Sequence, residues 1–199
     1  ALSTQVVAEE IMRRVYLPFL RGDALNAGAQ PVNEALTAAI SAANEAVHQA
    51  VPDAGTTLTC ALVLGTNAYI AHVGDSRAYL LCQGHLEQLT QDHSLVARLI
   101  ELGQISPEEA LDHPQRNVLY RAVGQVSNLE VDTYLQSLPR GSSLLLCSDG
   151  LWGAVPQEEI TRIITAAPSP QIACQRLVAA ANARGGEDNI TAVLIAIRS

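Results

Sequence analysis

Three aspartates in turn-like sequence have the neighbours expected of ligands to a divalent metal ion. Asp75 lies between two apolar, strand-like segments, Asp149 closely follows another such segment, and Asp188 precedes the last one. Aspartates at the ends of neighbouring strands can converge on one edge of a sheet. Hard cations such as Mg²⁺ and Mn²⁺ prefer carboxylate and water oxygens, and pairs of such ions hydrolyse phosphate esters.

Each aspartate taken alone also has a purely structural interpretation. Asp149-Gly150 and Gly74-Asp75-Ser76 are common turn sequences, and Asp188 can hydrogen-bond its own backbone after Gly185-Gly186. The metal-binding interpretation therefore depends on the sequence that surrounds the three residues.

Strands are predicted on both sides of each aspartate. Residues 57–64 and 68–73 form a predicted hairpin, and 78–82 and 85–89 continue it as an antiparallel meander. Later segments with many apolar residues predict strands over 131–135, 143–147 and 190–197.

Helices are predicted where apolar residues recur every three or four positions. They span residues 1–20, ending near Pro18, then 31–47, 92–102, a short turn from Ser106, 158–166, and 170–183 with Ser169 as cap. Along the chain, the predicted elements are helices, then a run of strands, then helices and a last strand. This order predicts an α+β fold, with helices packed on the faces of antiparallel sheets.

Composition narrows the function classes. A length of 199 residues predicts one domain, and a net charge of −8 argues against nucleic-acid or anionic-membrane partners. All 12 basic residues are arginines, which excludes Schiff-base chemistry and a lysine-dependent P-loop. The four cysteines form no CxxC pair and predict free thiols in a reducing, cytoplasmic compartment; no membrane-spanning run is visible.

Six ordered motifs resemble those of metal-dependent protein serine/threonine phosphatases of the protein phosphatase 2C type. They are Gly55-Thr56-Thr57, residues 71–79 (AHVGDSRAY), residues 89–94 (LTQDHS), residues 117–124, residues 146–152 (LCSDGLW) and Asp188-Asn189-Ile190-Thr191. The resemblance covers the chain from about its first residue to its last, with gaps in the loops.

This resemblance implies a fold, a cofactor and partners. The fold is a four-layer α-β-β-α arrangement, an antiparallel β-sandwich flanked by helices. The cofactors are two Mn²⁺ or Mg²⁺ ions, of which Asp149 and Asp188 hold one, and a third, weaker ion at Asp75. The substrates are phosphoserine and phosphothreonine in proteins phosphorylated by a serine/threonine kinase system. Direct attack by water requires no cysteine or histidine nucleophile.

The resemblance also assigns expected roles around the site. Residues 92–116 occupy the place of a mobile flap that governs substrate access. Arg77 and Arg121 are candidates for phosphate contact or for structural pairing, and pairing is favoured. His72 and His93 are expected to be packing and capping residues.

Two family features are absent from the sequence. One is an early strand that bears an arginine; the other is an Asp-Gly-Met-Gly-Gly turn whose aspartate bridges both metals. The sole Asp-Gly pair in these 199 residues is Asp149-Gly150. The chain is therefore expected to be a single phosphatase 2C-like domain over 1–199 that is N-terminally incomplete. A trimmed sequence is favoured, ahead of strands supplied by another chain and of a degenerate, non-catalytic relative.

Two alternatives to a phosphoprotein phosphatase follow from the same residues. One is a non-catalytic binding or regulatory module with a phosphatase-like fold. The other is a carboxylate-metal hydrolase for small phosphate compounds, because a metal centre alone does not select the leaving group.

Overall fold

The computed structural model describes residues 2–17 and 29–198, and these divide into two compact units. The first unit contains the chain up to Gly74 together with Asp92–Gln136, and the second contains Asp75–Gln91 and the chain from Ser137 onward. The expected end of the first helix at Pro18 and most of the loop that follows lie outside the described residues.

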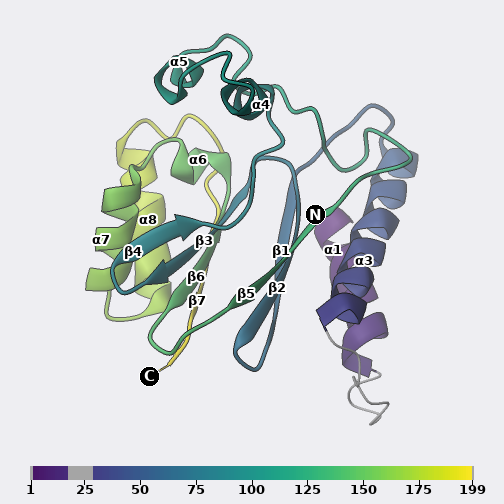
Figure 1. Cartoon of the computed structure of the whole chain (residues 1–199), viewed down its shortest axis with the longest axis horizontal. Helices are drawn as coiled ribbons and strands as arrows, with labels where there is room; N and C mark the ends of the chain where they lie inside the picture. The colour runs from purple at the N-terminus through teal and green to yellow at the C-terminus, as the bar shows by residue number, and fades with distance from the viewer. Residues whose placement is uncertain (1, 18–28, 199) are drawn as a thin grey trace. The chain divides into compact units, whose positions relative to one another are not determined.

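The first unit is built from two long helices, a three-stranded antiparallel sheet and two short helices (Figure 1). The sheet has the strand order β1-β2-β5. The elements are α1 (Leu2–Ile11), the π-helical turn η1 (Met12–Tyr16), α3 (Ala29–Ala50), β1 (Leu58–Leu64), β2 (Asn67–Val73), α4 (Leu95–Glu101), α5 (Pro107–Leu111) and β5 (Asp132–Ser137).

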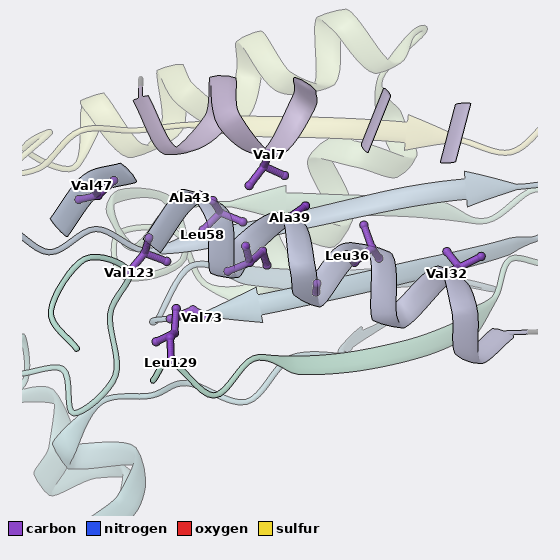
Figure 2. Packing of buried hydrophobic residues seen from close by; sticks show 12 residues of the cluster. Val7, Val32, Leu36, Ala39, Ala43, Val47, Leu58, Val73, Val123 and Leu129 are labelled. Carbon is purple, nitrogen blue, oxygen red and sulfur yellow. The ribbon is translucent and has the colours of Figure 1, made fainter. Parts of the chain in front are cut away.

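The apolar stripe of α3 forms the centre of the first unit's core. Leu36 and Ala43 on this helix are fully buried and belong to one cluster with Leu58 of β1 and Val73 of β2. Figure 2 shows these side chains gathered together, with Val7 of α1 beside them. The helical spacing of residues 31–47 therefore predicted both the helix and its buried face, since positions three and four apart lie on the same side of a helix.

The second unit packs two helices against a four-stranded antiparallel sheet of order β4-β3-β6-β7 (Figure 1). Leu145 of β6, Ile160 of α7 and Leu177 of α8 are fully buried in its core. The elements are β3 (Arg77–Cys82), β4 (His85–Gln88), β6 (Ser143–Cys147), α6 (Asp149–Trp152), α7 (Gln157–Ala166), α8 (Pro170–Ala183) and β7 (Ala192–Ala196).

The predicted α+β class is confirmed, because both units place helices against antiparallel sheets. No helix among residues 2–17 and 29–198 is long and apolar enough to cross a bilayer.

The predicted single meander of residues 57–89 is wrong. β1 and β2 pair with each other in the first unit, whereas β3 and β4 belong to the sheet of the second unit. Gly74, with a φ of 111°, lies where the chain leaves the first sheet. Turn residues mark the ends of strands but do not determine which strands pair, and β3 takes β6 as its second partner from far along the sequence.

The predicted helix over 92–102 begins three residues late, at Leu95. Ser94 is its cap, and its side chain accepts a hydrogen bond from the backbone N–H of Ala97. Asp92 and His93 are instead buried in non-helical backbone. The capping box at Ser106 is confirmed in both directions, as is the Ser169 cap of α8.

Candidate metal-binding site

The register of the second sheet brings the three aspartates to one edge. Arg77 of β3 pairs with Cys147 of β6, and Cys147 pairs with Ala192 of β7. Asp75 precedes the start of β3, Asp149 follows the end of β6, and Asp188 precedes β7. The strands are antiparallel, so these three termini lie at the same end of the sheet, as the sequence predicted.

Ser148 joins the turn that carries Asp149 to the loop that carries Asp188. Its hydroxyl donates to the carbonyl oxygen of Asn189 at 2.9 Å and accepts from the backbone N–H of Thr191 at 2.9 Å. Its own backbone N–H donates to the Thr191 carbonyl at 3.2 Å. Three hydrogen bonds from one residue thus fix the end of β6 against the chain that leads into β7.

Gly150 allows this close approach. A Cβ atom at this position would lie 2.6 Å from the Asn189 carbonyl oxygen, a distance that would force the two segments apart. The carboxylates also make the turn contacts that the structural interpretation predicted. Asp149 Oδ1 accepts from the Gly150 N–H at 2.9 Å, and Asp188 Oδ1 accepts from the Asn189 N–H at 2.6 Å.

The ionisation of Asp149 is disfavoured by its surroundings. Burial raises the pKa of Asp149 above its ordinary value, and the negative charge of Asp188 raises that pKa further. Both effects disfavour the ionised form, because a half-buried anion loses hydration and meets a like charge. A cation bound between the two side chains would offset both effects.

Asp75 approaches this site through its backbone. Its carbonyl oxygen accepts a hydrogen bond from Nε1 of Trp152, the last residue of α6, at 2.9 Å. Across the described residues, however, no group of three or more His, Cys, Asp or Glu side chains is arranged to hold a metal. The expected convergence is therefore one of strand ends and not of three carboxylates. Bringing a third anion beside Asp149 and Asp188 without a cation would add repulsion.

Arg121 forms the structural pairs that the sequence favoured, whereas Arg77 stacks on an aromatic ring. In the first unit, Arg121 donates to Oδ1 of Asp132 at 2.7 Å and to Glu130 at 2.6 Å. In the second, the Arg77 guanidinium lies over the Trp152 ring, 3.4 Å from its centroid. No local sequence signal predicts this stacking, because the two residues are far apart along the chain.

His72 is a fully buried packing residue, as expected, whereas the capping role expected for His93 is wrong. Two hydrogen bonds join His93 to Gly74 inside the first unit. The Gly74 N–H donates to Nδ1 of His93 at 3.0 Å, and the His93 backbone N–H donates to the Gly74 carbonyl at 2.7 Å. Since Nδ1 accepts, the neutral ring carries its proton on Nε2, which lies 3.2 Å from Oδ2 of Asp132. The sequence did not predict the two hydrogen bonds between His93 and Gly74.

We expect His93 to make the free energy of unfolding fall as the pH falls. Burial lowers the pKa of His93, and Arg121 lowers it further, against the opposing effects of Asp132 and Asp92. An unfolded histidine binds a proton near pH ~6.5, while the folded one resists it. Stability is therefore complete above about pH 6.5 and is lost below it, by up to about 1.4 kcal/mol per pH unit, until the folded pKa is reached.

Urea unfolding at several pH values between about 7.5 and 5 measures this loss. The matched pair is His93→Gln, which should flatten the pH dependence, and His85→Gln, at an exposed position of β4, which should leave it unchanged. An identical slope in the His93→Gln variant would contradict the expectation.

Comparison with known proteins identifies the family. Residues 8–99 match the family described as Protein phosphatase 2C. A serine/threonine phosphatase, Stp, of Listeria welshimeri is 45% identical over 141 residues, which make up 71% of this chain and 56% of that protein.

Solved structures agree over more of the chain. The serine/threonine phosphatase PstP/Ppp of Mycobacterium tuberculosis has a TM-score of 0.84 and 33% identity, with 99% of this chain and 82% of that chain covered. The catalytic domain of PstP in complex with two manganese ions has a TM-score of 0.76 and 31% identity, covering 96% and 79%.

The chain belongs to the protein phosphatase 2C family, a class of metal-dependent serine/threonine phosphatases. It spans only 56% of the length of the Listeria phosphatase.

Proposed function

We propose that this chain hydrolyses phosphoserine and phosphothreonine in proteins with the help of divalent metal ions. The observation that carries the proposal is that the turn with Asp149 packs closely against the chain of Asp188 and Asn189 at one sheet edge in a protein phosphatase 2C fold. The Ser148 hydrogen bonds support it, because ligands held by fixed partners bind metals more tightly than mobile ones.

The donor set suits a hard cation. Asp149 and Asp188 both offer carboxylate oxygens, and a positive charge between them would offset their mutual repulsion. We propose Mn²⁺ or Mg²⁺ as two core ions, with an accessory ion at Asp75; the solved PstP complex with two manganese ions supports the number and the metal by analogy. Such ions lower the pKa of bound water and neutralise charge on the phosphoryl group.

Two carboxylates are too few for a dinuclear centre. An Asp-Gly-x-Gly-Gly segment contributed by further polypeptide, either in the same chain or from a second one, would complete the donor set. We propose the same-chain origin, because the chain spans little more than half of its Listeria relative.

Two of the four thiols, those of Cys60 and Cys147, are poorly suited to act as nucleophiles. Burial raises the pKa of Cys60 to about 11, so this thiol is protonated at neutral pH, and Cys147 is buried within β6. A covalent cysteinyl-phosphate route needs a thiolate. Direct attack by water is therefore the mechanism that we propose.

The proposed partners are phosphoproteins produced by serine/threonine kinases, as the names of the relatives suggest. All four cysteines are free, which supports a reducing, cytoplasmic location. The segment with α4 and α5 is proposed as the flap that governs substrate access. It carries exposed apolar side chains, among them Leu102 and Leu111, that an approaching protein could cover.

The test is release of inorganic phosphate from a phosphothreonine peptide by the protein in its full natural length. We expect turnover with Mn²⁺, none with a chelator, and little with a sugar phosphate. Turnover that persists with the chelator would overturn the proposal.

Two other outcomes would support the alternative functions. Tight Mn²⁺ binding without turnover would support a non-catalytic binding module, which the shortage of ligands among the described residues favours as the second candidate. Preference for the sugar phosphate would support a hydrolase of small phosphate compounds.

A further inference from the structure

Trp152 connects two of the proposed metal-binding segments through one side chain. It ends the short helix α6, which begins at Asp149. Its indole Nε1 donates to the backbone carbonyl of Asp75 at 2.9 Å. Asp75 precedes β3 and Asp149 begins α6, far along the sequence, so this hydrogen bond ties the Asp75 loop to the Asp149 turn.

The Asp75 loop is held against the indole from a second direction. The guanidinium of Arg77 stacks on the Trp152 ring, 3.4 Å from its centroid, and tryptophan is the aromatic residue that attracts cations most strongly. Nη1 of Arg77 also donates to the hydroxyl of Tyr79 at 3.0 Å, and Tyr79 is fully buried in the core. The stack is therefore anchored in a rigid part of the second unit.

We propose that Trp152 is a positioning residue that orients Asp75 for an accessory metal ion and couples that ion to the Asp149 turn. The proposal rests on the proposed function, because it takes Asp75 and Asp149 as metal ligands. A hydrogen bond to the Asp75 carbonyl restricts rotation of the peptide that follows its Cα, and so holds in place the backbone that carries the carboxylate. Without this bond, the Asp75 loop and the Asp149 turn would lose a direct link between them.

The main test compares Mn²⁺ titrations of the full-length protein by calorimetry. Trp152→Phe keeps an aromatic ring for Arg77 but removes the Nε1–H donor, whereas Asp75→Asn removes the ligand itself. We expect the weak component of binding to lose about 10-fold or more in affinity in both variants, in line with other residues that orient a metal ligand. The tight component should stay within about twofold of the wild type.

A double variant separates positioning from general loss of stability. If Trp152 acts through Asp75, then Trp152→Phe in an Asp75→Asn background should weaken Mn²⁺ binding no further. Additive losses, or an unchanged weak component in Trp152→Phe, would overturn the proposal. Tyr79→Phe, which leaves both the indole donor and the Asp75 ligand in place, should weaken this component less than Trp152→Phe does.

Hydrogen exchange without metal distinguishes failure of this inference from failure of the proposed function. Trp152→Phe should speed amide exchange both at residues 75–77 and at residues 149–153. Faster exchange confined to residues 149–153 would overturn the coupling. If the wild type binds no Mn²⁺, the proposed function fails together with the accessory-ion role, while the exchange rates still decide whether Trp152 couples the two loops.

Discussion

Replacing Asp149 with asparagine is expected to weaken Mn²⁺ binding by at least about 100-fold and to abolish metal-dependent hydrolysis of a phosphopeptide. Loss of a residue that merely orients a ligand costs about 10–100-fold, so loss of a ligand should cost more. Asparagine has nearly the same shape as aspartate, and its amide oxygen can still accept the hydrogen bond from the Gly150 N–H. The loss of Mn²⁺ affinity would therefore be caused by the missing negative charge and not by disruption of the turn.

The same substitution is expected to raise stability in the absence of metal. The pKa of Asp149 is raised by burial and by Asp188, which means that the folded state disfavours its negative charge at neutral pH. A neutral side chain removes that unfavourable contribution. Thermal unfolding with chelator should therefore occur at a higher temperature in Asp149→Asn, whereas added Mn²⁺ should stabilise the wild type alone.

Glu187→Gln is the matched control for the Asp149 experiment. It removes one negative charge from an exposed residue directly beside Asp188, without touching either proposed ligand of the core ion. We expect less than a twofold change in Mn²⁺ affinity. Equal losses in the two variants would mean that the chain attracts cations through its general negative charge, and the metal site at Asp149 would be rejected.

Replacing Gly74 with alanine is expected to destabilise the first unit by about 3 kcal/mol. Its φ of 111° is strained for any residue with a side chain, at a cost of about 1–3 kcal/mol. In addition, the new Cβ would lie 2.5 Å from Cγ2 and 3.0 Å from Cα of Thr57, which adds an overpacking cost of about 1–3 kcal/mol. The substitution would also disturb both hydrogen bonds between Gly74 and His93.

Gly84→Ala separates the cost of the positive φ from the cost of the close contact with Thr57. Gly84 also has a positive φ, of 79°, but a Cβ atom there would meet nothing within 4 Å. This variant should lose only about 1–2 kcal/mol, the usual cost of a left-handed conformation. Urea unfolding of both variants provides the measurement, and equal losses would show that the contact with Thr57 relaxes without cost.

The sequence by itself determined the local structure around the site. A continuous apolar run bounded by turn residues located β6 over Ser143–Cys147 without error, and the capping residues Ser106 and Ser169 were correct. These features depend on neighbours within a few positions, since a cap or a turn is formed by the residues next to it. The six ordered motifs, two of which contain Asp149 and Asp188, likewise indicated the family.

Only the tertiary structure decided which strands pair and which side chains meet. β3 pairs with β6, whereas β2 belongs to the other sheet. Burial of apolar faces selects the strand with which β3 pairs, and the turn at Gly74 does not. In the same way, folding brought the Asp149 turn against the chain of Asp188 and Asn189, and it formed the hydrogen bonds between Trp152 and Asp75 and between Gly74 and His93. Such contacts join residues distant in sequence, and no local pattern encodes their geometry.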